Sequence, residues 1–144
     1  MATNTGSDSF LASRVDAAAL PLSVGDLLVI VAFIYAGTLR HGTVPFPPTS
    51  VAAVGALLGV AAPFLLGWVV AAPLIGAYSA GAAESAKASV PLAVRSWIPA
   101  AVVGLALRAT PYVDGGVAVA FAVVMVVVGS VSLGLWRFVA GRLG

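Results

Sequence analysis

Long apolar runs alternate with short polar or turn-forming stretches along the whole chain. The runs cover about residues 22–40, 50–78, 90–109 and 117–137. Each is close to, or longer than, the roughly 20 residues that an α-helix needs to cross a bilayer. The stretches between them are rich in proline, glycine and small polar residues, which favour turns. The pattern predicts an all-α membrane protein with four transmembrane helices in an up-down bundle.

The two ends of the chain are more polar than its middle. Residues 1–21 show no basic head joined to an apolar run and a cleavage site, so we expect a polar cytoplasmic tail rather than a signal peptide. Residues 22–137 should form a single transmembrane domain, because four spans use nearly all of this length. Residues 138–144 then make a short C-terminal tail.

Composition supports a lipid environment. Of the 144 residues, 61% are hydrophobic and 8% are charged, and the mean hydropathy is +1.12. Soluble domains average roughly 25% charged residues, because they need a solvated surface. The seven basic residues are scattered singly and form no stripe, which excludes a nucleic-acid partner. The lipid bilayer is the expected partner.

The placement of lysine and arginine predicts the orientation. With four spans, the N-terminal tail, the second connection and the C-terminal tail share one side of the membrane. That side holds Arg14, Lys87, Arg95, Arg137 and Arg142, and the other holds Arg40 and Arg108. Positive residues are retained on the cytoplasmic side. We therefore expect a multi-pass protein of the cell membrane with cytoplasmic N- and C-termini.

Charges flank unusually short apolar cores in the first and third spans. Asp26 and Arg40 are about 21 Å apart along a helix, and Arg95 and Arg108 about 20 Å, whereas the hydrocarbon core is about 30 Å thick. These side chains must therefore snorkel to the interface or find a partner. Asp26 and Arg95 lie at the same end of their spans, so the geometry allows a direct pair between them.

Simpler roles compete for the same charged residues. Arginines near span ends usually snorkel to headgroups, so Arg40 and Arg108 either do this or attract an anion together with His41. Asp26 either pairs within the membrane or completes a capping box with Ser23. His41 is expected to be interfacial rather than part of a proton relay, since the chain has no second histidine.

Phe64, Trp68 and Trp97 are candidate pocket-lining residues. Pro63 is expected to kink the second span, and rings beside a kink either line a pocket or face lipid. The sequence leaves both readings open.

Signatures of catalysis and metal binding do not occur in the sequence. It has no cysteine, one histidine and dispersed carboxylates, so no spacing matches a metal site. It has no paired carboxylates at workable depth and no phosphate-binding glycine loop. We expect neither an enzyme nor a cofactor.

Several short motifs together resemble a known family. They are Asp26, Phe33, Gly37, Arg40, His41 and Gly42 in the first span, residues 63–68 (PFLLGW) in the second, and Trp97, Gly104 and Arg108 in the third. This succession resembles the prokaryotic family catalogued as domain of unknown function 3054, from about residue 26 to the end of the fourth span. The resemblance implies a small four-span membrane protein without an assigned activity.

Two classes of function fit these features. One is a small transporter or channel-like subunit, whose charged groups line a polar path between spans one and three. Because 144 residues are few for a monomeric path, this function would need a homo-oligomer. The alternative is a structural or accessory membrane protein whose charges fix helix packing and bind lipid headgroups. A membrane enzyme acting on a lipid or quinone is a weaker third option, and the sequence names no ligand.

Overall fold

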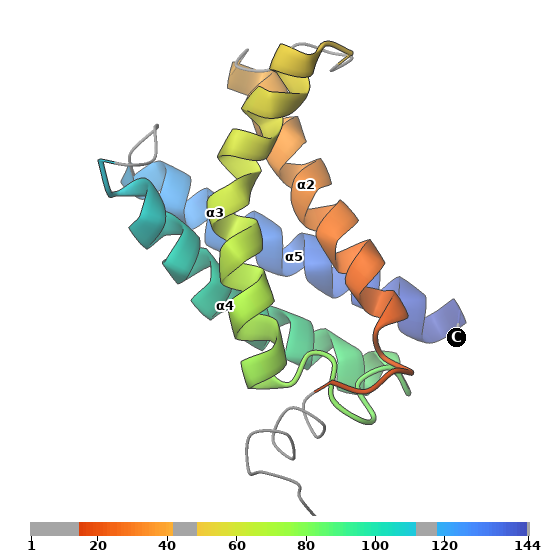
Figure 1. Ribbon diagram of the computed structural model, residues 1–144. Helices are drawn as coiled ribbons and strands as arrows, with labels where there is room; N and C mark the ends of the chain where they lie inside the picture. The colour runs from red at the N-terminus through yellow and green to blue at the C-terminus, as the bar shows by residue number, and fades with distance from the viewer. Residues whose placement is uncertain (1–14, 42–48, 112–117, 144) are drawn as a thin grey trace, which may run out of the picture.

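The computed structural model describes residues 15–41, 49–111 and 118–143, and this part of the chain contains four long α-helices (Figure 1). They are α2 (Pro21–His41), α3 (Val51–Ile75), α4 (Ala86–Arg108) and α5 (Val119–Leu143). All four are long and apolar enough to cross a membrane. The predicted fold class, an all-α membrane protein with four transmembrane helices in an up-down bundle, is confirmed.

The four helices form a closed ring. Each packs against the next in chain order, and α5 returns to pack against α2. The most extensive contacts join α3 to α4 and α4 to α5. Figure 1 shows α2 and α3 side by side, with α5 crossing behind them. Within the described residues α2 and α4 lie diagonally and their backbones do not meet.

Serines and a glycine define several helix ends. The side chains of Ser50 and Ser85 accept hydrogen bonds from backbone N–H groups in the first turns of α3 and α4, at 3.0 and 3.2 Å. Such capping satisfies N–H groups that have no partner within the helix. Gly76 ends α3 in the left-handed conformation, with φ of 105°, which glycine adopts without strain. The second span therefore stops at Ile75, before the expected end near residue 78.

The last helix is longer than the fourth apolar run. We expected a tail from residue 138, but α5 continues to Leu143. Arg137 therefore lies within the helix, six residues before its end. The charge of Arg137 is compensated by a buried partner, so the helix does not have to leave the bilayer at this residue.

Three aromatic side chains sit over glycines of a neighbouring helix. The pairs are Phe64 over Gly104, Trp97 over Gly129, and Trp136 over Gly25. A methyl group at any of these glycines would collide with the ring above it. Small residues of this kind let membrane helices approach closely. The three pairs join α3 to α4, α4 to α5 and α5 to α2.

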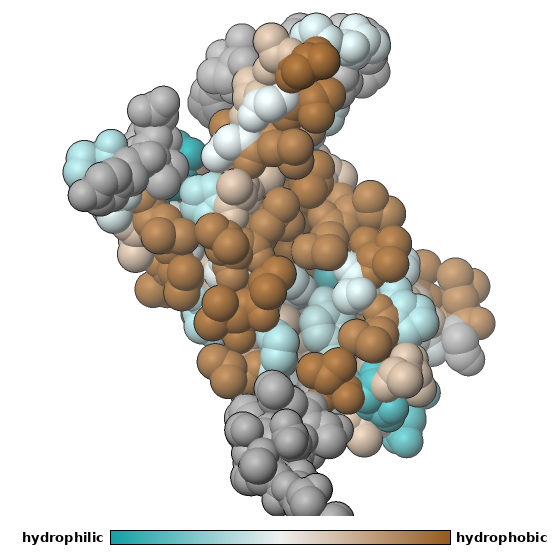
Figure 2. All heavy atoms as spheres, viewed as in Figure 1, coloured by the Kyte–Doolittle hydropathy of each residue, from teal (hydrophilic) through white to brown (hydrophobic). Residues whose placement is uncertain are grey.

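The outside of the bundle is apolar. Exposed leucine, valine or isoleucine side chains occur on all four helices. Figure 2 shows hydrophobic side chains over most of the viewed face, with the most hydrophilic ones at its edges. A surface of this kind is stable against lipid tails and unstable in water, so the chain is a multi-pass membrane protein.

Candidate functional site

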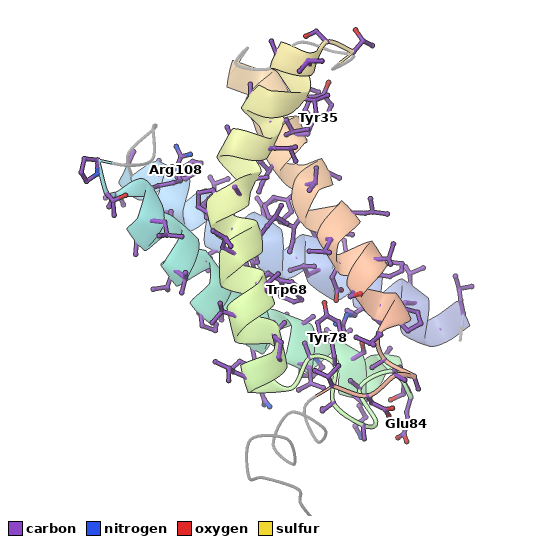
Figure 3. The ribbon with its side chains drawn as sticks, in the orientation of Figure 1. Tyr35, Trp68, Tyr78, Glu84 and Arg108 are labelled. Atoms are coloured by element: carbon purple, nitrogen blue, oxygen red, sulfur yellow. The ribbon has the colours of Figure 1, made fainter. Side chains whose placement is uncertain are left out.

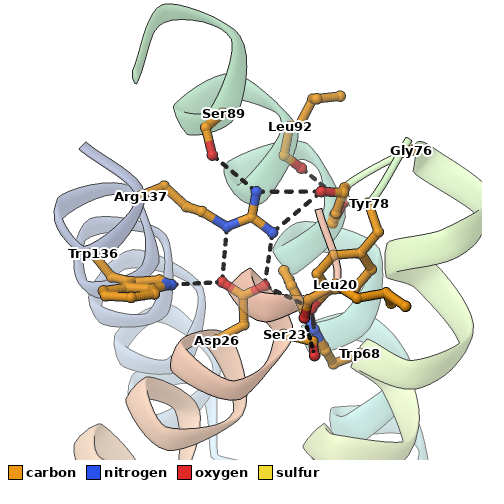
Figure 4. Close-up of polar contacts among 12 residues, drawn as sticks. Leu20, Ser23, Asp26, Trp68, Gly76, Tyr78, Ser89, Leu92, Trp136 and Arg137 are labelled. Atoms are coloured by element: carbon orange, nitrogen blue, oxygen red, sulfur yellow. Dashed lines mark hydrogen bonds and ion pairs between the residues drawn. The ribbon is translucent and has the colours of Figure 1, made fainter. Parts of the chain in front are cut away.

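An ion pair lies in the core where α2 meets α5. Asp26 and Arg137 are both fully buried. Arg137 Nε donates to Asp26 Oδ1 at 2.8 Å, and Nη2 donates to Oδ2 at 2.7 Å (Figure 4). This is the two-pronged geometry in which a guanidinium matches a carboxylate. Each charge thereby compensates the other in a region where an isolated ion would be very costly.

The remaining donors of Arg137 also have partners. Nη1 donates to Ser89 Oγ at 2.9 Å, and both Nη1 and Nη2 donate to the Ala77 carbonyl, at 3.2 and 3.3 Å. With the two bonds to Asp26, these account for all five N–H groups of a guanidinium. The side chain is therefore held by α2, by α4 and by the connection between α3 and α4.

The Asp26 carboxylate accepts two further hydrogen bonds. Trp136 Nε1 donates to Oδ1 at 2.9 Å, and the Tyr78 hydroxyl donates to Oδ2 at 2.6 Å. The same hydroxyl accepts from Trp68 Nε1 at 2.8 Å. We call Asp26, Trp68, Tyr78, Ser89, Trp136 and Arg137 the buried polar cluster. Its members come from all four helices and the α3–α4 connection, so one network ties the whole bundle together.

Tyr78 is positioned by the backbone as well as by its hydroxyl. Gly76 turns the chain out of α3, and the Tyr78 carbonyl accepts from the Asp16 N–H at 2.7 Å. Its ring lies 5.4 Å from the Arg137 guanidinium carbon. Burial and then the negative charge of Asp26 raise the pKa of Tyr78 above its ordinary value of 10.0. The phenol is therefore neutral and remains a donor to Asp26.

Asp26 does not pair with Arg95, as the spacing had suggested. Arg95 is exposed on α4, which lies diagonally across the ring from α2, so the two spans are not neighbours at this level. The capping box is also wrong. Ser23 is the third residue of α2, and its hydroxyl donates to the Leu20 carbonyl at 2.6 Å.

Arg108 lies at the opposite end of the bundle from Tyr78 (Figure 3). It is partly buried at the end of α4, and its guanidinium carbon is 4.5 Å from the centroid of the Phe121 ring. A cation over an aromatic face is a favourable contact. Arg40 and His41 end α2, and their side chains lie outside the described residues. The structure thus separates Arg108 from the buried polar cluster.

The three candidate pocket residues are packed in the core. Phe64, Trp68 and Trp97 are all buried. Trp97 Nε1 donates to the Met125 carbonyl of α5 at 2.9 Å, and its ring meets Phe33 edge-on at 5.4 Å. Phe64 and Trp97 fill the space above Gly104 and Gly129. None of the three rings lines the surface hollow between α4 and α5 or the one beside the α3–α4 connection. Trp68 belongs to the buried polar cluster.

The sequence interpretation missed four members of the cluster. They are Tyr78, Ser89, Trp136 and Arg137. Arg137 was predicted on the same side of the membrane as Asp26, and this was the available signal. Tyr78 lies in the α3–α4 connection and Ser89 in the first turn of α4. Both are uncharged, and nothing in the sequence around them indicates a buried polar contact.

The described residues contain no group of three or more histidine, cysteine, aspartate or glutamate side chains that could hold a metal ion. What the cluster offers chemically is one neutralised ion pair with a neutral phenol beside it. The pair itself, neighbouring polar side chains and the Ala77 carbonyl occupy every hydrogen-bonding position of the two charged groups.

Comparison with known proteins gives one match. No curated protein and no solved structure matches the chain. A family model described as "Protein of unknown function (DUF3054)" matches residues 23–140, which include all four helices apart from their outermost residues. The matched range contains every member of the buried polar cluster. The chain therefore belongs to the DUF3054 family of proteins of unknown function.

Proposed function

We propose that this protein is a structural or accessory protein of the membrane. Its buried ion pair fixes the packing of the helices, and its peripheral cations bind lipid headgroups. One observation carries the proposal: Asp26 and Arg137 have all their hydrogen bonds within the chain. A guanidinium with five bonds and a carboxylate with four leave no position for a solute or a water molecule.

The free-energy cost of separating Asp26 from Arg137 also argues that their contact is permanent. A group that passes protons or ions across a membrane has to exchange its partners during each cycle. Separating Asp26 from Arg137 would leave a buried charge unpaired, at a cost of about 3–5 kcal/mol. The transporter or channel-like subunit that the sequence suggested therefore gains no support from the described residues. Under this proposal the protein is neither an enzyme nor dependent on a cofactor.

The charges also favour one orientation. Lys87 and Arg142 are exposed at the end of the bundle where α4 begins and α5 ends, and Arg108 lies at the other end. We place the first of these ends in the cytoplasm, because juxtamembrane cations are retained there and interact with anionic lipids. The protein would then be a multi-pass component of the cell membrane with both termini inside.

Reconstituted vesicles test this proposal. The protein is incorporated into liposomes containing a pH-sensitive dye, and a potassium diffusion potential set with valinomycin drives proton entry. Osmotic swelling measures small neutral solutes in parallel. We expect the permeability of protein-free vesicles for both wild type and Asp26→Asn, with a lower unfolding temperature for the variant. A wild-type flux that Asp26→Asn abolishes at an unchanged unfolding temperature would overturn the proposal and favour transport.

A further inference from the structure

A shallow, open groove lies on the outside of the bundle between α4 and α5. Its volume is about 440 Å³. It is lined mainly by Val90 and Val94 of α4 and by Val131, Gly134, Leu135 and Phe138 of α5. Gly134 faces the two valines of α4, because a methyl group on it would be in ordinary contact with Val90 and Val94. A groove of this composition accepts a hydrocarbon chain.

The face of each helix that lines the groove continues to a cation. On α4, Lys87 precedes Val90 by three residues and Val94 by seven, so all three share one face. On α5, Arg142 follows Phe138 by four residues and stands on the same side. The Arg142 guanidinium carbon lies 5.7 Å from the Phe138 ring centroid, so its charge lies against the end of the groove.

A close helix contact brings these two cations together. At the start of α4 and the end of α5, a methyl group on Gly141 would collide with the backbone of Ala86. Lys87 and Arg142 are the next residues along each helix, and both are exposed. The two helices therefore present two like charges beside one another at the level of the helix ends.

No described carboxylate neutralises this pair of cations. Within residues 15–41, 49–111 and 118–143 the structure contains a single ion pair, between Asp26 and Arg137. The nearest acid in sequence is Glu84, whose carboxylate lies beside Gly81 in the α3–α4 connection. Two neighbouring cations at the membrane interface attract a shared anion.

We infer that the groove binds one anionic phospholipid, with its phosphate between Lys87 and Arg142 and an acyl chain along Val90, Val94 and Leu135. The dimensions agree. Ser130, the deepest lining residue of α5, is 12 residues from Arg142, or about 18 Å along the helix. This is close to the depth of one leaflet, which is about half of a 30 Å hydrocarbon core. The inference rests on the proposed function, because it names a lipid that the peripheral cations bind.

Native mass spectrometry tests the inference on full-length protein released from mixed micelles. Wild type should retain phosphatidylglycerol and not phosphatidylcholine. Each cation near a membrane contributes about fivefold to affinity for an anionic lipid. Lys87→Gln with Arg142→Gln should therefore weaken phosphatidylglycerol binding by about 25-fold. Arg95→Gln is the matched control, because it removes an exposed α4 cation off the groove, and it should leave retention unchanged.

Three outcomes would overturn the inference. They are undiminished binding in the double variant, equal retention of phosphatidylcholine, and efficient disulfide-linked dimers of Leu135→Cys in vesicles. The last result would show that a second copy covers the groove, and it is readable because the chain has no other cysteine. If only the lipid inference is wrong, the reconstituted vesicles still show no flux. If the proposed function is wrong, the vesicles show flux, whatever the result of the lipid-binding measurement.

Discussion

Asp26 and Arg137 are 111 residues apart in the sequence, and two parallel hydrogen bonds of 2.8 and 2.7 Å join them in the core. The pair links the first membrane-spanning helix to the last and so closes the ring of four. Apolar association between helices is weak in lipid, because lipid tails compete equally well for apolar side chains. A directional ionic contact therefore specifies which helices become neighbours.

Replacing Tyr78 with phenylalanine removes one hydrogen bond to Asp26 and leaves Trp68 Nε1 without its acceptor. Hydrogen bonds to charged groups contribute about 1.5–3 kcal/mol. We expect the free energy of unfolding, measured by denaturing-detergent titration in micelles, to fall by about this amount. Ser79→Ala is the control, since it removes a neutral hydrogen bond, from Ser79 Oγ to the Gly76 carbonyl, in the same connection. Equal and small losses in the two variants would contradict the role of Tyr78.

The raised pKa of Tyr78 predicts a pH dependence. In the unfolded chain the phenol loses its proton near pH 10, whereas in the folded protein it keeps the proton to higher pH. Stability is therefore complete below pH 10 and falls above it, by roughly 1.4 kcal/mol per pH unit. Tyr78→Phe lacks this loss. The stability advantage of wild type over the variant should be constant from pH 7 to 9 and shrink above pH 10; an advantage that grows there would refute the assignment.

Two glycines of α3 should respond oppositely to alanine. A methyl group on Gly67 would collide with the Ala100 carbonyl of α4, whereas nothing lies within 4 Å of one on Gly55. Gly67→Ala should push the helices apart and cost about 1–3 kcal/mol in the same titration. Gly55→Ala should be neutral or slightly stabilising, because alanine favours the helix. Similar effects of the two substitutions would place the α3–α4 contact elsewhere.

Single cysteines test the proposed orientation. The chain has none of its own, so Thr49→Cys, Ala80→Cys and Ala118→Cys each report one connection. On intact cells, a membrane-impermeant maleimide should label positions 49 and 118. Position 80, in the α3–α4 connection, should react after the membrane is opened. If position 80 alone were labelled on intact cells, the topology would be the reverse of the proposed one.

The four spans were predictable because a run of about 20 apolar residues has one stable solution in lipid. The importance of Asp26 was also predictable, since a carboxylate inside the apolar layer needs a partner. The identity of that partner was not. Arg95 and Arg137 were both predicted on the same side of the membrane as Asp26, and the choice between them depends on which helices are neighbours in the ring.

The packing of the aromatic residues also depends on partners distant in sequence. Trp97 fills the space above Gly129, and Phe64 fills the space above Gly104, so rings that looked able to line a pocket are core residues. Neither the order of the residues nor their spacing along one helix reveals such a match. Tyr78 escaped notice for a related reason, because its role depends on the turn at Gly76 that aims it at Asp26.

A double-mutant cycle in micelles measures the coupling between Asp26 and Arg137. Asp26→Asn and Arg137→Gln should each lower the free energy of unfolding by about 3–5 kcal/mol, because each leaves the other charge buried and unpaired. The double variant should lose at least about 2 kcal/mol less than the sum of the two. Arg95→Gln, which removes an exposed arginine, should change stability by less than about 0.5 kcal/mol. If the losses of Asp26→Asn and Arg137→Gln simply add, the ion pair does not hold the bundle together.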